Sequence, residues 1–312
     1  MSGIVLVALG GHVLLPKDAE PDIGSQFRHA RDAMRRVLGL VRQGWEMVIT
    51  HGNGPQVGHI LIRTEAAAGQ AYAIPLSVAV AESEGEIGYV IQQSLYNELA
   101  AVGISRPIVT ILTQVLVDAQ DPAFGNPTKP VGPYLQEEPA QRLRDSGVPV
   151  AHYPGYGWRR VVASPIPLRI IEGETVRRLA EQEVIVIAAG GGGIPVVESQ
   201  GRLTGVDAVI DKDLASSVLA QSIGAELLLL LTDVPRAALN FQQPNQVDLD
   251  SLTVRQAEEY LAEGHFPPGS MGPKVAGAAA FVRATGGRAI ITTPEHLDAA
   301  LRGEQGTQIT LE

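Results

Sequence analysis

The chain has 312 residues, 45% of them hydrophobic and 19% charged, which is typical of a folded globular protein with one large or two medium domains. Its formal net charge of −10 disfavours a nucleic-acid partner, because an acidic surface repels a polyanion. The absence of cysteine excludes disulfides, thiolate metal sites and a cysteine nucleophile.

Short apolar runs alternate with longer amphipathic stretches along the chain. The runs that predict strands are residues 4–9, 46–50, 107–112, 184–189, 227–231 and 288–292. Apolar residues at helical spacing predict helices over residues 26–44 and 92–102. Strands separated by helices are typical of βαβ units. The sequence therefore predicts a three-layer αβα sandwich with a mostly parallel central sheet.

Residues 118–156 break this rhythm, with seven prolines and several isolated glycines. Because βαβ signals flank the stretch on both sides, we expect an inserted, protruding lid subdomain rather than a linker. A domain boundary is expected near residues 201–205, which divides the chain into residues 1–204 and 205–312. Residues 1–11 lack the basic start of a signal peptide, and the aliphatic run 227–231 is far too short to cross a bilayer. These features predict a cytoplasmic protein.

Three of the predicted strands end in glycine clusters, at Gly10-Gly11, at Gly52-Asn53-Gly54 and at residues 190–193. In open α/β sheets ligands bind beyond the carboxyl ends of the strands, where glycine lets backbone N–H groups approach an anion. Tight turns alone would explain one such cluster. Four consecutive glycines are costly to order, so three clusters together favour an anion site. The motif G-x-x-x-x-G-K-S/T, a dinucleotide-binding G-x-G-x-x-G and H-E-x-x-H are all absent.

Three lysines are candidates for binding a phosphoryl group, although most lysines are simply solvated surface residues. Lys212 lies between two aspartates, Asp211 and Asp213, at a predicted helix start. Lys274 follows a glycine-proline loop and precedes a helix predicted over residues 275–282, and Lys129 lies in the insertion. Phosphoryl transfer depends mainly on positioning and charge neutralisation, which such lysines provide. Asp213 fits two interpretations: a helix N-terminal acid, or a carboxylate that orients the lysines.

The sequence resembles the carbamate kinases of the amino-acid-kinase superfamily, in order and from end to end. The segments that carry the resemblance are residues 7–11, 51–58, 85–89, 112–115, 126–133, 157–162, 190–196, 205–215, 231–234 and 269–274. Two of them, Asn126-Pro127-Thr128-Lys129-Pro130 and Gly269-Ser270-Met271-Gly272-Pro273-Lys274, are specific to carbamate kinases within the superfamily.

The resemblance implies reversible phosphoryl transfer between ATP and carbamate, with Mg²⁺ as the cofactor. It also implies a homodimer and a role in arginine metabolism. It implies that Lys212 and Lys274 neutralise the phosphoryl group, that Asp213 orients them, and that Lys129 closes over carbamate. The acceptor site that it implies comprises Gly10, Gly11, His12, Gly52, Asn53 and Gly54. The nucleotide site that it implies comprises Gly191, Thr232, Asp233, Val234, Ser270, Met271, Gly272 and Pro273.

The chain departs from the family pattern at His12, at Val13, where a small residue is usual, and at Ile166. His12 stands where asparagine is usual, and Ile166 stands where the segment after the Trp158-Arg159 pair usually has lysine. Two alternatives therefore stay open: a related kinase for another small carboxylate or carbamate-like acid, and a catalytically silent nucleotide sensor of the same fold. The metal ligands are not predicted by the sequence.

Overall fold

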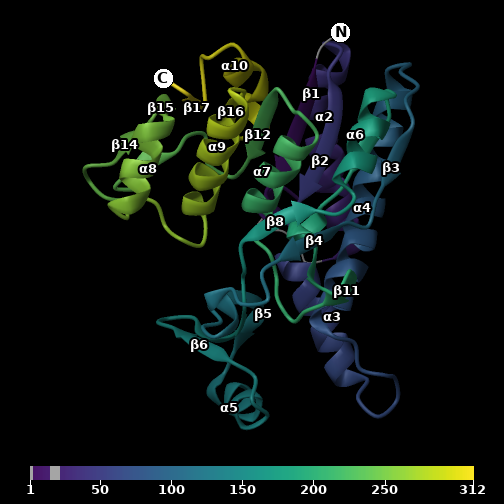
Figure 1. Cartoon of the computed structure of the whole chain (residues 1–312), viewed down its shortest axis with the longest axis vertical. Coiled ribbons are helices and arrows are strands. Elements are labelled where there is room, and N and C mark those ends of the chain that lie inside the picture. The colour runs from purple at the N-terminus through teal and green to yellow at the C-terminus, as the bar shows by residue number, and fades with distance from the viewer. Residues whose placement is uncertain (1–2, 15–21) are drawn as a thin grey trace.

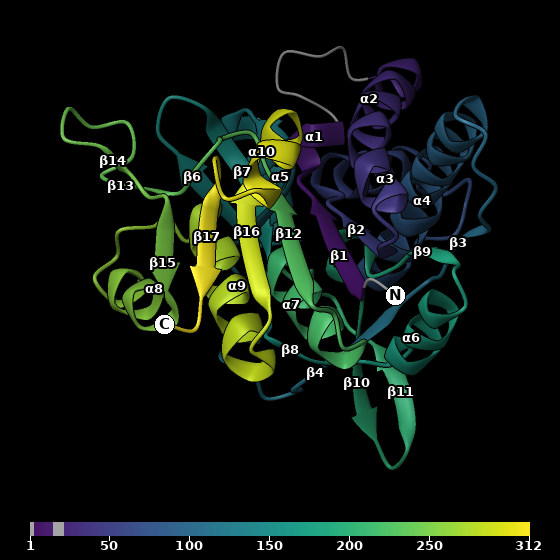
Figure 2. The ribbon, with the colours of Figure 1, turned by 90° about the horizontal axis from the view of Figure 1, so that it is seen from above.

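The structure, a computed structural model, describes residues 3–14 and 22–312, except for the side chain of His12. Its centre is an eight-stranded sheet in the order β15-β17-β16-β12-β1-β2-β9-β3 (Figure 2). Six of these strands are parallel, and β15 and β17 run in the opposite direction. The bounds are β1 (Ile4–Leu9), β2 (Glu46–His51), β3 (Ile108–Thr110), β9 (Ile185–Ile187), β12 (Leu227–Leu231), β15 (Ser251–Thr253), β16 (Arg288–Thr292) and β17 (Thr307–Thr310).

Helices cover both faces of this sheet, as Figures 1 and 2 show together. One face packs against α6 (Gly173–Glu181), α7 (Lys212–Ser222), α8 (Val254–Ala262) and α9 (Met271–Thr285). The other packs against α2 (Ile23–Arg42), α4 (Leu76–Ala101) and α10 (Leu297–Leu301). Side chains of β1 alternate between the two cores: Leu6 lies in the first, and Val5 and Val7 lie in the second. The uncharged aliphatic runs of β1 and β12 fit strands that are buried on both sides.

A second, four-stranded sheet lies beside the first, in the order β11-β10-β4-β8. Its strands are β4 (Gln114–Val117), β8 (Pro167–Ile170), β10 (Ile194–Ser199) and β11 (Arg202–Gly205). β4 and β8 are antiparallel, and Val117 is paired with Pro167. The insertion therefore leaves and re-enters the body of the protein at adjacent positions.

The insertion protrudes from the body at the lower end of Figure 1. It contains the three-stranded sheet β5-β7-β6 and one α-helix. Its elements are η1 (Pro122–Phe124), β5 (Lys129–Leu135), α5 (Glu137–Asp145), β6 (Val150–Tyr153) and β7 (Gly157–Val162). The remaining elements of the chain are α1 (Gly11–Leu14), α3 (Gly54–Ala66), η2 (Gly190–Gly192), β13 (Ala238–Leu239), β14 (Val247–Asp248) and η3 (Pro294–His296).

The predicted αβα architecture and the protruding subdomain are confirmed, with corrections to several boundaries. The strands predicted at 227–231 and 288–292 match β12 and β16, whereas those at 107–112 and 184–189 shorten to three residues each in β3 and β9. The subdomain ends at Val162, six residues later than predicted. No helix in residues 3–14 and 22–312 combines the length and the apolar character needed to cross a membrane.

Two helix predictions were too short. The predicted helix 92–102 begins at Leu76, because the buried polar residues Ser83 and Glu84 interrupt the apolar pattern of α4. The helix predicted from residue 275 begins at Met271, because Pro273 is compatible with a first helical turn. Lys274 is therefore part of α9 rather than its prelude.

Candidate functional site

Loops that follow parallel strands meet at one edge of the central sheet. The Gly10 amide donates to the Leu231 carbonyl at 2.8 Å, and the Gly52 amide donates to the Leu9 carbonyl at 3.1 Å. A Cβ atom added at Gly52 would lie 2.9 Å from the amide nitrogen of Gly11. Two of the predicted glycine clusters therefore pack backbone to backbone, which a larger residue at Gly52 would prevent.

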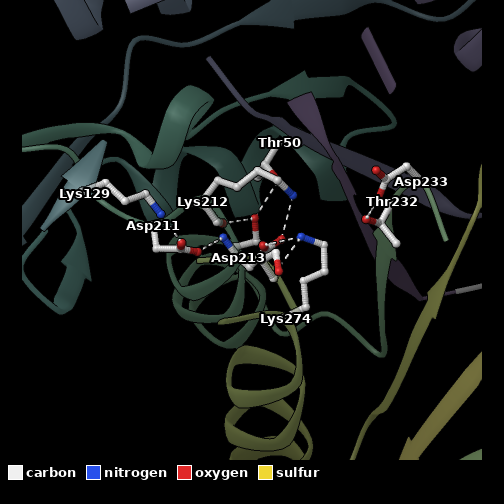
Figure 3. A network of polar contacts seen from close by, with 10 residues as sticks. Thr50, Lys129, Asp211, Lys212, Asp213, Thr232, Asp233 and Lys274 are labelled. Carbon is white, nitrogen blue, oxygen red and sulfur yellow. Dashed lines mark hydrogen bonds and ion pairs between the residues drawn. The ribbon is translucent and has the colours of Figure 1, made fainter. Parts of the chain in front are cut away.

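The three charged residues Lys212, Asp213 and Lys274 form one buried cluster beyond this edge (Figure 3). Asp213 accepts from Lys212 Nζ through Oδ1 at 2.6 Å and from Lys274 Nζ through Oδ2 at 3.0 Å. The side chains of the two lysines are 12% and 11% exposed, and that of Asp213 is 4% exposed. One carboxylate therefore holds two ammonium groups at a defined position.

The electrostatics of the cluster follow from its burial. Burial lowers the pKa of Lys212, and the neighbouring Lys274 lowers it further, while Asp213 opposes both effects. Burial alone would raise the pKa of Asp213, but the two adjacent ammonium groups outweigh it and the pKa falls. Two cations around one anion leave a net positive site, which suits a polyanionic ligand.

Hydrogen bonds tie the cluster to the neighbouring elements. The Ser216 hydroxyl donates to the Lys212 carbonyl at 2.6 Å and lies 2.6 Å from the Thr50 hydroxyl of β2. Asp211 caps α7, since its Oδ1 accepts from the Asp213 amide at 2.9 Å. The sequence analysis missed Thr50 and Ser216, because no local pattern joins residues this far apart in the chain.

Lys129 reaches the cluster from the insertion. Its Nζ donates to Asp211 Oδ2 at 2.5 Å, and its side chain is 29% exposed (Figure 3). β5, which carries Lys129, packs closely on α3: a Cβ at Gly58 would lie 2.3 Å from the Cα atom of Gly132. The structure thus brings all three predicted lysines to the start of α7.

The third glycine cluster, residues 190–193, forms a buried turn after β9. A Cβ at Gly191 would lie 1.9 Å from the Asn53 side-chain nitrogen, and one at Gly192 would lie 2.3 Å from the Ile210 carbonyl. Gly191, which the resemblance places in the nucleotide site, packs against Asn53, which it places in the acceptor site. Gly54 begins α3.

His12 lies in α1, and its side chain is outside the described part of the structure. His51 ends β2 and is 1% exposed. Burial lowers the pKa of His51 to about 4, so the ring is neutral near pH 7. Its Nδ1 lies 3.3 Å from the Gly52 carbonyl oxygen, within the loop that follows β2.

A cavity of about 390 Å³ opens beside the two lysines. Its walls include the predicted nucleotide-site residues Thr232, Asp233, Val234, Ser270 and Met271. Gly272 and Pro273 lie in the first turn of α9, outside the lining. The lining residues that the sequence analysis missed are Arg236, Ala238, Phe241, Gln242, Pro267 and Gly269. The signal available in the sequence was Phe241, an aromatic residue between the polar residues Asn240 and Gln242.

The charge inventory defines what the site can do. Two ammonium groups and glycine-rich turns lie at one end of a cavity large enough for a nucleotide, which suits binding and stabilising a moving phosphoryl group. Within residues 3–14 and 22–312, no three His, Asp or Glu side chains gather in a metal-binding group.

Comparisons with known proteins agree with this arrangement. The sequence model of the amino acid kinase family matches residues 3–293. The carbamate kinase of Pyrococcus horikoshii is 48% identical over 311 residues, which cover 98% of each chain. The carbamate kinase-like protein YqeA of Escherichia coli is 45% identical over 313 residues and 99% of each chain. The structure of Giardia lamblia carbamate kinase bound to AMP-PNP has a TM-score of 0.92 at 40% identity, over 99% of this chain and 98% of that one.

Proposed function

Because the chain belongs to the amino acid kinase family, we propose that it is a carbamate kinase, which transfers a phosphoryl group reversibly between ATP and carbamate. The resemblance found in the sequence and its expected fold class are confirmed by relatives of 48% and 40% identity along nearly the whole chain. The observation that carries the proposal is that Lys212 and Lys274, which share the single carboxylate of Asp213, both line the cavity.

In the proposed reaction a carbamate oxygen attacks the γ-phosphorus of ATP, and the bond to the oxygen that bridges the β- and γ-phosphates breaks. Negative charge spreads over the oxygens of the transferring group, where Lys212 and Lys274 stabilise it. Asp213 holds both ammonium groups in place through its two oxygens. Carbamate is already an anion, so the step needs no general base, and the buried, neutral His51 agrees with this.

We assign the acceptor to the glycine turns and the nucleotide to the cavity. Gly10, Gly11, Gly52 and Asn53 would surround the acceptor, and Lys129 would cover it from the insertion. The amides of Gly10 and Gly52 already donate to Leu231 and Leu9, so the N–H groups for the acceptor would come from Gly11 and Asn53. The nucleotide would lie against Thr232, Asp233, Val234, Ser270 and Met271. The division into an acceptor domain of residues 1–204 and a nucleotide domain of residues 205–312 belongs to the same proposal, as does the homodimer.

Mg²⁺ is proposed as the cofactor. The described residues offer no dedicated cage for it, and both oxygens of Asp213 already accept from lysines. Mg²⁺ in kinase sites is commonly held by substrate phosphates and water with only one or two carboxylates, so these residues fit an ion that arrives with the nucleotide. When bound, the ion would neutralise phosphate charge.

A related kinase for another small carboxylate is the second candidate. Ile166, in place of the lysine usual in the family, is 56% exposed and offers no charge to an acceptor, while its amide donates to Asp121. A silent nucleotide sensor is disfavoured, because a protein that only binds nucleotide would not need Lys129, Lys212, Asp213 and Lys274 together.

The deciding experiment is ATP formation from ADP, Mg²⁺ and carbamoyl phosphate, with acetyl phosphate as a parallel donor. Rapid ATP formation from carbamoyl phosphate supports the carbamate kinase proposal. Faster turnover of acetyl phosphate would favour the second candidate. ADP binding by calorimetry without ATP formation from either donor would leave the nucleotide sensor.

A further inference from the structure

Glu84 is a buried carboxyl group that the proposed reaction does not use. It lies in the first half of α4 and is 1% exposed, with the buried residues Val80 and Ile87 one turn away on either side. Its Oε2 accepts from the Thr113 amide at 2.9 Å, while its Oε1 has no hydrogen-bond partner among the described residues. Among those residues it also forms no ion pair, so a negative charge here would have no compensation.

The partner of Glu84 holds both ends of the glycine turn 190–193. The Thr113 hydroxyl accepts from the Ala189 amide at 2.9 Å, and the Thr113 carbonyl accepts from the Ile194 amide at 2.8 Å. Ala189 and Ile194 flank the four glycines on either side. A bond from Glu84 to the amide of Thr113 therefore fixes the residue that closes the turn.

The turn needs such support because its backbone is strained. Ala189 has φ 49° and ψ 40°, a left-handed conformation that costs an alanine about 1–2 kcal/mol. Strained backbone of this kind persists only where neighbouring contacts over-determine it. Thr113 and Glu84 provide those contacts.

The glycine turn 190–193 also contacts two segments of the proposed active site. Gly191 contacts Asn53, and Gly192 contacts the carbonyl of Ile210, the residue before Asp211. Gly190 lies between His51 and Glu84, since a Cβ there would meet both side chains. A displacement of the turn would therefore move the acceptor loop and the start of α7 together.

We propose that Glu84 acts as a neutral carboxylic acid and is a positioning residue, which holds the glycine turn 190–193, and through it Asn53 and Asp211, in the geometry for acceptor binding. The relation to acceptor binding rests on the proposed function. The role of Glu84 as a neutral support of the turn stands on the contacts alone.

The ionisable groups around Glu84 agree with a neutral state. Burial raises its pKa well above the ordinary 4.5, the Thr113 amide opposes this, and the charge of Glu172 at the start of α6 adds to it. His51, the other titratable neighbour, is itself neutral near pH 7. A carboxyl group with a raised folded-state pKa makes the protein less stable as the pH rises from the ordinary value towards the raised one.

The test compares Glu84→Gln and Glu84→Ala with the unaltered protein, with Glu82→Gln, at an exposed position of α4, as the matched control. The carboxamide is neutral at every pH and still accepts from the Thr113 amide. Thermal unfolding from pH 5 to pH 9 should show the unaltered protein and Glu82→Gln losing stability relative to Glu84→Gln as the pH rises. The folding equilibrium constant should change by about tenfold per pH unit between the two pKa values.

Hydrogen–deuterium exchange reports on the turn without any assay of activity. At one pH, peptides that cover residues 186–196 should exchange at least about tenfold faster in Glu84→Ala, and Glu84→Gln should restore protection. With carbamoyl phosphate and ADP, Glu84→Ala should lower kcat/KM for carbamoyl phosphate about tenfold and change the KM for ADP less than twofold. Glu84→Gln should rescue the former.

Two results would overturn the proposal. One is parallel stability profiles for the unaltered protein and Glu84→Gln across the pH range, which would mean that Glu84 is ionised in the folded state. The other is unchanged exchange at residues 186–196 in Glu84→Ala. If the predicted changes in exchange and stability occur but the unaltered protein does not turn over carbamoyl phosphate, the proposed reaction is refuted and the support role of Glu84 stands.

Discussion

Gly277 on α9 packs directly against the backbone of Asp213 on α7. A Cβ atom at Gly277 would lie 2.7 Å from the Asp213 carbonyl oxygen, closer than such atoms approach. The two helices that carry Lys212 and Lys274 therefore owe their separation to the absence of a side chain at this one position. The distance between Lys274 and Asp213 is a property of helix packing as well as of charge.

Gly277→Ala should accordingly lower kcat. The added methyl group pushes α9 away from α7, and misplacing a catalytic group by about 1 Å can cost about a hundredfold in rate. We expect kcat to fall roughly ten- to hundredfold and the free energy of unfolding to fall by about 1–3 kcal/mol because of overpacking. Gly85→Ala on α4, where a Cβ meets nothing within 4 Å, is the control and should retain kcat. An unchanged kcat in Gly277→Ala would separate the helix spacing from catalysis.

Lys212→Ala should reduce kcat by about a hundred- to a thousandfold, since a group that stabilises developing charge contributes mainly in the transition state. The Kd of ADP, measured by calorimetry, should rise only modestly. Arg255→Ala, at an exposed position of α8, provides the control for a lost cation. Normal turnover by Lys212→Ala would show that Lys212 does not take part in the reaction, even though it is buried next to the cavity.

Lys129→Met should lower kcat/KM for carbamoyl phosphate about a hundredfold, because the ammonium group reaches the start of α7 from the insertion. The KM of ADP should stay within about threefold, since Lys129 is not part of the cavity lining. Steady-state kinetics with each substrate varied in turn distinguish the two effects. Arg142→Met on α5 removes an exposed cation from the same subdomain and should leave both parameters alone. Equal effects of the two variants would point to a general loss of charge.

His51 should make the protein less stable in acid. The ring has a folded-state pKa of about 4 against an ordinary 6.5, so the unfolded chain binds a proton in this window and the folded chain does not. Stability should therefore fall as the pH decreases from 6.5 to 4, by up to about 3 kcal/mol. The free energy of unfolding of the unaltered protein and of His51→Asn, measured with denaturant at pH 7, 5.5 and 4, tests this prediction. Parallel pH profiles of the two proteins would contradict the prediction.

The hydrophobic pattern of the sequence predicted best those elements whose side chains are mostly apolar along their whole length. β12 and β16 are apolar on both faces and were predicted to the residue. The prediction for α4 covered only residues 92–101, because the earlier part of the helix buries Ser83 and Glu84, whose partners Asn53 and Thr113 lie in other segments of the chain. A helix that buries polar groups against distant loops carries no local signature of its own.

The site was predictable to the same extent. Lys129, Lys212, Asp213 and Lys274 could be named because of their motifs, and the structure brings them together. The packing of Gly191 against Asn53 depends on tertiary structure and could not be predicted from the sequence. Thr50, Ser216 and Thr113 act through hydrogen bonds between segments far apart in the chain, which no spacing rule describes.

The pairing of Val117 with Pro167 has a consequence for how this architecture can vary. The two ends of the insertion are paired residues on antiparallel strands, so the insertion is joined to the sheet in the same way as the loop of an ordinary β-hairpin. The cost of closing a loop grows only slowly with its length, so this junction tolerates a short turn or a whole subdomain with little change in the sheet. The subdomain that carries Lys129 is thus a module, which could be exchanged for a short turn or for another subdomain while the body of the fold stays the same.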